Sequence, residues 1–337
     1  MRIAALVSAV ALLFGGQPAS WTRTPVPIDK GDIAAVAALS DRDAWALGYR
    51  LISTTNLQAV ALRWNGRTWT QESTLPARTF PQAIAVAAAN DIWEAGDGTS
   101  HWDGSTWTKH ALEGEMVPEA LATVGGRTWV AGANTPDSIK DSVPDVQAWD
   151  GSRWRRQPLP QLGKGTLTSI AALAPDNVWA AGYTTAGATQ ATLVVHWDGR
   201  TWRKIDSPSV AGSHTWVSGL TANNANEVWA VGGSVKGTAE RPFAMRWDGR
   251  GWTITPTPDV ADGRLRGAAR VGADLWAVGG KGTATVALRW NAAARSWTPA
   301  PAPDISVRGL AAAGNGGLWA VGLAKQGDLT PAITRYH

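Results

Sequence analysis

The sequence predicts an all-β fold, a closed ring of similar sheets, and three patterns support that prediction. A Trp followed by two residues and Gly occurs seven times in 337 residues. A second Trp, usually followed by Asp-Gly or Asn-Gly, comes after the first, and a third Trp follows a few residues later. The first Trp recurs every 36 to 50 residues, a period typical of propellers and solenoids. No segment shows a sustained helical period.

The three recurrent Trp positions account for almost all of the 21 tryptophans. The first position holds Trp45, Trp93, Trp129, Trp179, Trp229, Trp276 and Trp319. The second holds Trp64, Trp102, Trp149, Trp197, Trp247 and Trp290, and the third holds Trp69, Trp107, Trp154, Trp202, Trp252 and Trp297. Only Trp21 and Trp216 remain, so most Trp residues belong to the architecture of the repeat.

Each unit is expected to hold four strands. Segments such as 192–197 (TLVVHW) are short, rich in β-branched and aromatic residues, and bounded by Gly, Pro or Asp, which indicates strands. An Asp-Gly or Asn-Gly pair between two such runs favours a tight hairpin, because the turn needs positive φ. The flanking Trp residues then lie opposite each other and pack between sheets. In the first unit we expect strands at about 33–39, 44–49, 60–64 and 68–72.

The seventh unit lacks a fourth strand after Trp319, because the chain stops at His337. The missing strand would begin Trp-Thr, and residues 21–27 (WTRTPVP) closely match residues 252–258 (WTITPTP). We therefore expect the strand at Trp21 to pair with the C-terminal unit. This pairing predicts a seven-bladed β-propeller of four-stranded blades, closed without exposed edge strands.

The order of motifs resembles that of kelch and galactose-oxidase propellers. Residues 275–301 read LWAVGGKGTATVALRWNAAARSWTPAP, with an apolar strand ending in Gly-Gly, a variable loop and a later Trp. Only two units carry the Gly doublet, and Trp replaces the usual Tyr. In style the chain is also similar to secreted, Ala- and Trp-rich propellers of actinobacteria, including lectin-like subunits of umbrella toxin particles. The resemblance covers residues 21–337 and implies a binding module.

Residues 1–20 have the form of a secretory signal. An early Arg precedes an apolar run at 3–14 and then the small residues of GGQPAS, the order expected of an exported protein. The apolar run is shorter than the roughly 20 residues that span a bilayer. We expect cleavage near Ser20, a secreted propeller domain at 21–337, and no membrane span.

Composition argues against several classes of function. The formal net charge is only +4 and no Lys/Arg stripe is present, so nucleic acid is not an expected partner. Cysteine is absent, which removes thiol chemistry and the Tyr–Cys crosslink of galactose oxidase. The histidines lack metal-ligand spacing, and no nucleophile elbow occurs. We expect no metal, no cofactor and no catalytic residue.

The residue before the second Trp is polar in most units, and we expect it to make a repeated structural contact. These residues are Arg63, His101, Ala148, His196, Arg246, Arg289 and Arg335. Acids of the second strand, Asp43, Asp91 and Asp274, are the expected partners.

Departures from the repeat point to the binding site. Segments 50–58, 133–145, 233–241 and 323–331 vary most and are expected to be loops on one face. Trp216 has no place in the repeat and would lie at the channel mouth. Aligned inner-strand positions carry Ala34, Gln82, Thr168, Ser218, Arg266 and Arg308. Gln82, Trp216, Arg266 and Arg308 are the candidate ligand-binding residues, because an aromatic ring beside two guanidinium groups suits a sugar face or a carboxylate. The structural alternative is that Trp216 packs in the core and that the two Arg residues form local salt bridges.

Three functions remain open from the sequence. The first is lectin-like recognition of cell-surface carbohydrate, as a subunit of a larger exported complex. The second is a protein-interaction scaffold that binds a peptide at the channel mouth. The third is a propeller enzyme acting on polysaccharide, since propeller enzymes assemble sites from single residues on many blades. The partner is therefore expected to be a carbohydrate or a secreted protein.

Overall fold

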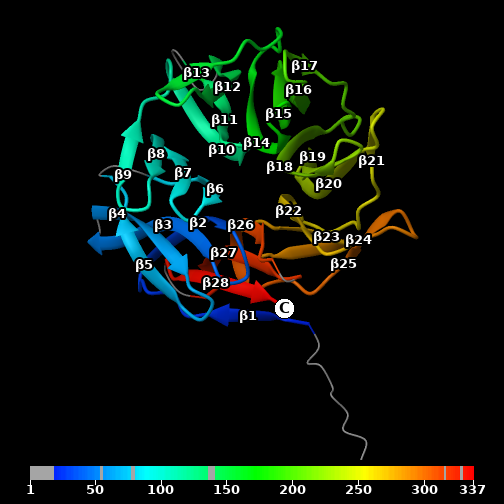
Figure 1. Cartoon of the computed structure of the whole chain (residues 1–337). Coiled ribbons are helices and arrows are strands. Elements are labelled where there is room, and N and C mark those ends of the chain that lie inside the picture. Colours follow the sequence, from blue (N-terminus) through cyan, green and yellow to red (C-terminus); the bar gives the residue numbers. More distant parts are fainter. Residues whose placement is uncertain (1–18, 54–55, 77–79, 136–140, 315, 327–328) are drawn as a thin grey trace, which may run out of the picture.

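The protein is a ring of seven blades around a central axis (Figure 1). The computed structural model describes residues 19–53, 56–76, 80–135, 141–314, 316–326 and 329–337. Within these residues there are seven sheets, each of four antiparallel strands, and no helix. The first strand of each blade contacts the first strand of the next blade, so these seven strands surround the axis.

The first four blades follow the chain from the inner to the outer strand. Blade 1 is β2 (Gly31–Ala38), β3 (Ala44–Ser53), β4 (Asn56–Trp64) and β5 (Trp69–Thr74). Blade 2 is β6 (Ala83–Ala88), β7 (Asp91–Gly96), β8 (Gly98–Trp102) and β9 (Trp107–His110). Blade 3 is β10 (Met116–Val124), β11 (Arg127–Asn134), β12 (Val143–Trp149) and β13 (Trp154–Arg156). Blade 4 is β14 (Gly165–Ala174), β15 (Asn177–Ala186), β16 (Thr189–Trp197) and β17 (Trp202–Lys204).

Blades 5 and 6 have the same order, and blade 7 joins the two ends of the chain. Blade 5 is β18 (His214–Asn224), β19 (Glu227–Lys236), β20 (Ala239–Trp247) and β21 (Trp252–Ile254). Blade 6 is β22 (Leu265–Val271), β23 (Asp274–Gly279), β24 (Val286–Asn291) and β25 (Ser296–Pro299). Blade 7 is β26 (Ile305–Ala312), β27 (Leu318–Ala324), β28 (Pro331–Tyr336) and β1 (Trp21–Thr24).

The N-terminal strand closes the ring, as the sequence predicted. Strand β1 pairs antiparallel with β28, with Trp21 opposite Tyr336, and the C-terminus lies beside β1 (Figure 1). The Trp21 and Tyr336 ring centroids are 5.5 Å apart, and Trp21 Nε1 donates a hydrogen bond to the Pro301 carbonyl at 2.7 Å. Because one blade holds both ends, opening the ring requires separating the four residue pairs between β1 and β28 and breaking these contacts.

Trp residues connect each blade to the next. The first Trp of one blade packs on the second Trp of the following blade: Trp319 on Trp64, Trp45 on Trp102, Trp93 on Trp149, Trp129 on Trp197, Trp179 on Trp247 and Trp229 on Trp290. Trp276 packs on Tyr336 at the seventh junction. In blades 1 to 6 the second and third Trp are strand partners, as predicted; Trp64 and Trp69 are one such pair. Each aromatic contact contributes about 0.5–1.5 kcal/mol beyond its buried area.

The Asp-Gly motif makes the outer hairpin turn. Asp103 Oδ1 accepts hydrogen bonds from the backbone N–H groups of Ser105 and Thr106 at 2.8 Å, which holds the pKa of this carboxyl well below its usual value. Gly104 follows at φ 99°, a conformation that favours glycine. Four residues separate the paired Trp102 and Trp107, so the turn is longer than the two-residue hairpin that Asp-Gly commonly indicates.

The Gly that ends each Trp-x-x-Gly motif has a steric cause. A Cβ on Gly132 would lie 2.0 Å from the carbonyl oxygen of Val117, on the inner strand of the same blade. The corresponding glycines of all seven blades meet a carbonyl at 2.0 to 2.2 Å. In six of the blades the inner strand bulges beside this contact, and any larger residue would push the two strands apart.

In blades 1, 2 and 6 the polar residue before the second Trp pairs with the expected acid of the second strand. Arg63 Nη2 lies 3.0 Å from Asp43 Oδ2, and its guanidinium is 5.4 Å from the Trp45 ring centroid. His101 Nε2 lies 2.9 Å from Asp91 Oδ1. Asp274 pairs in the same way with the Arg of β24, Arg289. These groups stabilise the blade rather than form a site.

Two of the variable segments, 50–58 and 233–241, are largely strand, which corrects the loops expected there. Strand β3 continues to Ser53 and β4 begins at Asn56, so most of segment 50–58 is an extended hairpin. In blade 5 only two residues separate the paired Lys236 and Ala239, and the first, Gly237, has φ 62°. The main-chain hydrogen bonds available between adjacent strands favour this extension over an open loop.

The expected signal segment lies almost wholly outside the described residues. Residues 1–18 are not described, and Ser20 exchanges backbone hydrogen bonds with His337 at 3.1 and 3.4 Å. Within the described part of the chain, no helix has the length and apolar character needed to cross a membrane.

Candidate binding face

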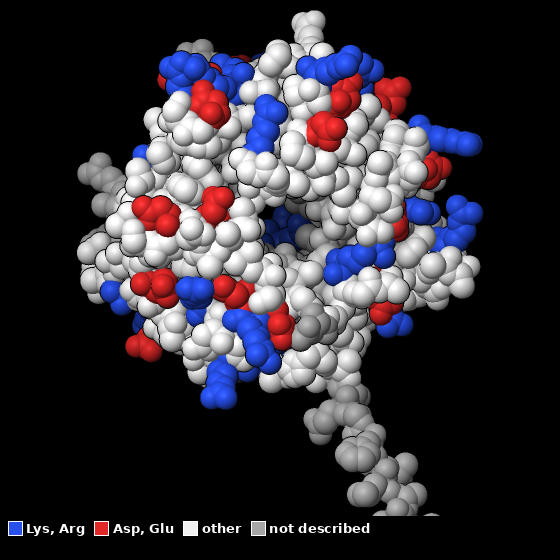
Figure 2. All heavy atoms as spheres, in the orientation of Figure 1, with Lys and Arg blue, Asp and Glu red and all other residues white. Residues whose placement is uncertain are grey.

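The inner strands present seven side chains to the central channel from equivalent positions. In six blades this residue is the extra residue of a β-bulge, because the residues before and after it pair with consecutive residues of the second strand. In blade 2 it directly precedes β6. A bulge leaves its residue unpaired and redirects the side chain. The seven, called the bulge ring, are Ala34, Gln82, Glu119, Thr168, Ser218, Arg266 and Arg308. Figure 2 shows a central hollow with Lys or Arg atoms visible at its base.

The bulge ring contains three of the four residues predicted for the site. Gln82 is exposed and lines a channel cavity together with Arg308. Arg266 lies on the adjacent blade, where burial and the nearby guanidinium groups of Arg264 and Arg308 lower its pKa. The two arginines are therefore neighbours at the channel, as the aligned positions suggested.

Trp216 lies on β18, two residues before the bulge residue Ser218. It is half-buried and pairs in register with Gly233 of β19. A Cβ on Gly233 would lie 2.5 Å from Trp216 Cζ2 and 3.1 Å from Arg264 Cβ, so the indole covers this glycine. The second Gly of the doublet in blade 5 thus makes room for Trp216, and part of the indole remains accessible.

Arg308 has a protein partner. Its Nε donates a hydrogen bond to Asp32 Oδ2 of blade 1 at 3.2 Å, so this pair connects blades 7 and 1. Asp32 is buried, and its other oxygen, Oδ1, has no hydrogen-bond partner among the described residues. Burial raises the pKa of Asp32, although Arg308 opposes that shift.

A second ionic cluster lies between blades 5 and 6. Buried Glu240 is flanked by Arg264 Nε at 3.5 Å and Lys281 Nζ at 3.3 Å. Lys281 also reaches Asp262 at 3.5 Å. Arg264, Lys281, Arg266 and Arg308 therefore make this side of the mouth rich in cations. The acids beside them, Glu240 and Asp32, each already have a cationic partner.

A groove of about 650 Å³ lies between blades 3 and 4. Blade 3 supplies one wall and blade 4 the other. The lining residues are Val117, Glu119, Ala133, Thr135, Ser142, Lys164, Gly165, Thr166, Tyr183, Thr185 and Gly187. Lys164 on the rim is held by Asp141, with Nζ 2.7 Å from Oδ1. Glu119 lines both this groove and the channel cavity, so the groove opens onto the mouth.

Glu119 is the site residue that the sequence reasoning missed. It is half-buried, and burial raises the pKa of its carboxyl. Burial and then the charge of Glu119 raise the pKa of Tyr183, and both residues line the groove. The signal was present in the repeat, because Pro118-Glu119-Ala120 aligns with Leu265-Arg266-Gly267.

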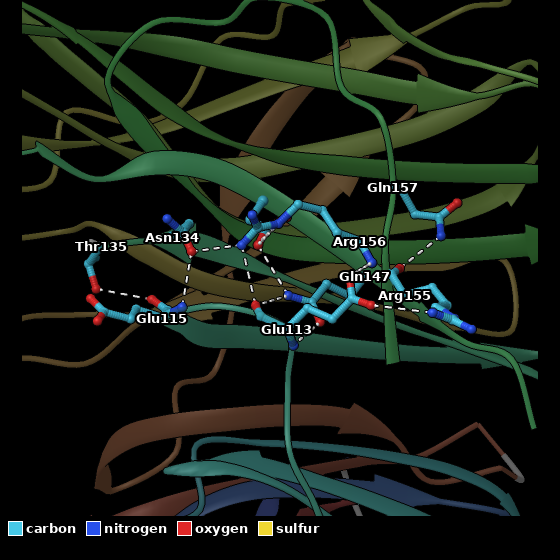
Figure 3. A network of polar contacts seen from close by, with 9 residues as sticks. Glu113, Glu115, Asn134, Thr135, Gln147, Arg155, Arg156 and Gln157 are labelled. Atoms are coloured by element: carbon cyan, nitrogen blue, oxygen red, sulfur yellow. Dashed lines mark hydrogen bonds and ion pairs between the residues drawn. The ribbon is translucent and has the colours of Figure 1, made fainter. Parts of the chain in front are cut away.

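A polar network fixes the rim of the groove in blade 3 (Figure 3). Gln147 is fully buried; its Nε2 donates to the Glu113 carbonyl and its Oε1 accepts from the Glu113 N–H, both at 2.9 Å. Arg156 donates to Asn134 Oδ1 at 2.7 Å and to Asp145 Oδ2 at 3.1 Å. These bonds hold the loop between blades 2 and 3 against β12 and connect β13 to β11 and β12.

The same network reaches the groove through Thr135. Its backbone N–H and Oγ1 donate to the Glu115 carbonyl at 3.0 and 3.2 Å, and Thr135 also lines the groove. The rim is thus preorganised, which lowers the entropic cost of binding a ligand there.

The chemistry of the face fits recognition by charge and shape. Among the described residues, no group of three or more His, Cys, Asp or Glu side chains is arranged to hold a metal ion. The isolated charges of Glu119 and Arg266 lie on opposite sides of the ring, three blades apart.

Comparisons with known proteins identify the architecture. No protein-family model matches the chain, and no curated protein matches it in sequence. A solved structure of YCF48 bound to D1 peptide superposes with a TM-score of 0.61 at 14% identity, covering 98% of this chain and 99% of that one. YCF48 from Cyanidioschyzon merolae gives 0.64 at 12% identity, covering 94% and 98%. The chain is a seven-bladed β-propeller. The propeller of RRP9 WD40 repeats gives 0.63 at 8% identity, covering 94% and 98%, and at such identities the likeness concerns the fold alone.

Proposed function

We propose that this propeller is a non-catalytic scaffold that binds an extended peptide segment of a partner protein. The groove between blades 3 and 4 is the observation that carries the proposal. Its volume of about 650 Å³ falls in the range of ligand sites, and it opens onto the channel at Glu119. The structure of YCF48 bound to D1 peptide supports the idea that a ring of this shape accommodates a peptide.

Exposed apolar side chains on the same face favour a protein partner. This face carries the hairpins between second and third strands and the connections between blades. Among the described residues, six of the eight large apolar side chains that are exposed lie on it, at the hairpins or at strand ends beside them: Ile52, Leu57, Phe80, Val117, Val143 and Leu329. Such residues gathered on one face are typical of interaction surfaces.

Export remains part of the proposal, because residues 1–20 have the form of a signal segment. The kelch-like and actinobacterial resemblance fits an extracellular role. We therefore place the partner among secreted or surface proteins of the same organism.

Carbohydrate recognition is the competing function, and Trp216 is the residue that favours it. An accessible indole beside guanidinium groups stacks well on a sugar face. Part of that ring covers Gly233, however, and the bulge ring holds no aromatic residue to join it. For this reason we favour the peptide.

Capture of partners from culture supernatant of the source organism tests the proposal. Tyr183→Ala enlarges the groove and removes the phenol beside Glu119, whereas Arg200→Ala changes an exposed outer turn of the same blade. We expect a stoichiometric protein to bind the parent and Arg200→Ala but not Tyr183→Ala, with both variants folded by circular dichroism. Equal capture by both variants would refute the groove.

A glycan array probed in parallel separates the alternatives. The peptide proposal predicts no glycan signal above background. A glycan signal that Trp216→Ala abolishes, together with no protein capture, would establish the carbohydrate function in its place. Release of reducing sugars from polysaccharide by the purified protein would instead show an enzyme.

A further inference from the structure

Two charged members of the bulge ring lack any protein partner. Glu119 of blade 3 and Arg266 of blade 6 make no hydrogen bond and no ion pair with the described residues, whereas Arg308 binds Asp32. Both side chains are half-buried. A charge removed from water without a partner is costly, so each is expected to gain a partner when the mouth is occupied.

The surroundings of Glu119 select a cation. The Lys that lines the groove among the described residues, Lys164, already pairs with Asp141, and Tyr183, which lines the groove with Glu119, is a phenol. The network cations of blade 3, Arg155 and Arg156, are bonded to Asp150 and Asp145. A Lys or Arg side chain entering the groove would therefore meet a free carboxylate in a partly dehydrated site, where such pairs are strong.

The surroundings of Arg266 select an anion. Its acidic neighbours are already paired, since Asp32 binds Arg308 and Glu240 lies between Arg264 and Lys281. The guanidinium offers several N–H groups in a planar fork that matches a carboxylate. An Asp, a Glu or a chain terminus of the ligand fits this position.

We propose that the bound peptide carries a basic residue that pairs with Glu119 and an acidic group that pairs with Arg266. This inference rests on the proposed peptide-binding function and adds its specificity. Because the two charges lie three blades apart across the channel, they fix the direction of the peptide over the mouth. A peptide with the charges reversed would place like charges together.

Phage display of random dodecapeptides on the immobilised full-length protein tests the proposal. Four proteins are panned: the parent, Glu119→Gln, Arg266→Gln and, as a matched control in the same ring, Ser218→Ala. Peptides selected by the parent are expected to be enriched several-fold in both Lys/Arg and Asp/Glu at a constant spacing. Glu119→Gln should lose only the basic enrichment, Arg266→Gln only the acidic one, and Ser218→Ala neither.

A binding cycle with one selected synthetic peptide gives the pairwise coupling. Loss of a charge-assisted pair in a partly buried site weakens binding by about 10- to 100-fold. Replacing the basic residue of the peptide with Gln should therefore weaken binding to the parent by that factor, yet change binding to Glu119→Gln by less than about twofold. Equal losses in both proteins would overturn the assignment to Glu119.

The outcomes distinguish this inference from the function on which it rests. Selected peptides without charge enrichment, or with an enrichment that neither variant alters, would overturn the two-charge inference and leave peptide binding standing. A failure to select any peptide together with no capture of a natural partner would overturn both. A failure to select any peptide with capture of a natural partner would overturn the two-charge inference alone.

Discussion

Replacing Glu94 by Gln should stabilise the protein increasingly as pH rises. Glu94 follows Trp93, where the other blades have Ala or Val. Its side chain is 1% exposed, and Oε1 has no hydrogen-bond partner among the described residues. Burial raises the pKa of this carboxyl from 4.5 to about 8, because the charged form is poorly solvated there.

The sign and size follow from proton linkage. A carboxyl with a raised pKa binds more protons in the folded than in the unfolded state, so stability falls as pH rises from about 4.5 to about 8. At about 1.4 kcal/mol per pKa unit, the cost in the wild type is about 1 kcal/mol at pH 5, about 3 kcal/mol at pH 7 and about 5 kcal/mol at pH 9. Gln does not ionise, so Glu94→Gln removes this cost.

Urea unfolding of the two proteins at pH 5, 7 and 9 measures the effect. The stability difference should grow by about 4 kcal/mol between pH 5 and pH 9. Glu115→Gln is the control, because Glu115 is exposed and its side chain makes no bond with the described residues; its stability difference should stay constant. A difference for Glu94→Gln that does not change with pH would show that Glu94 remains charged in the folded protein.

The remaining predictions concern the architecture. Gly232→Ala should lower the free energy of unfolding by about 3 kcal/mol, because the added Cβ would lie 2.0 Å from the Trp216 carbonyl oxygen. The control is Gly251→Ala in the same blade, where a Cβ would meet no atom within 4 Å. It should change the free energy of unfolding by less than about 1 kcal/mol. Trp21→Ala should cost about 3 kcal/mol and expose the ring closure to limited proteolysis; unchanged cleavage would argue against closure by β1. Thr168→Val should cost about 1 kcal/mol in thermal unfolding, because Oγ1 bonds the Val217 carbonyl of the next blade at 2.5 Å; no loss would mean that this bond does not stabilise the blade junction.

Much of the fold was predictable because the repeat carries its physical causes in the sequence. The Trp pair around each Asp-Gly predicted the outer hairpin, and the match between the segment at Trp21 and the one at Trp252 predicted ring closure. Strand ends were less predictable. Segment 50–58 has no strong alternation, yet β3 and β4 extend through most of it because each strand satisfies the backbone groups of the other.

The candidate site was predictable only in part. Aligned positions located Gln82, Arg266 and Arg308, since a repeat places equivalent residues in equivalent positions. The sequence does not show which of the neighbouring residues Arg266 and Arg308 has a partner. The partner of Arg308 is Asp32, which lies 276 positions away in the chain.

The sequence by itself determined the number of blades, the Trp contacts between them and the closure of the ring, because these depend on residue types at a regular period. The tertiary structure decided which residues face the channel and which charges stay unpaired. Both depend on bulges in the inner strands. Beside each bulge a carbonyl lies so close to the second strand that only glycine fits at position 132 and at the equivalent positions. Glu119 and Arg266 lie at such bulges, and only the closed ring brings them to the same mouth.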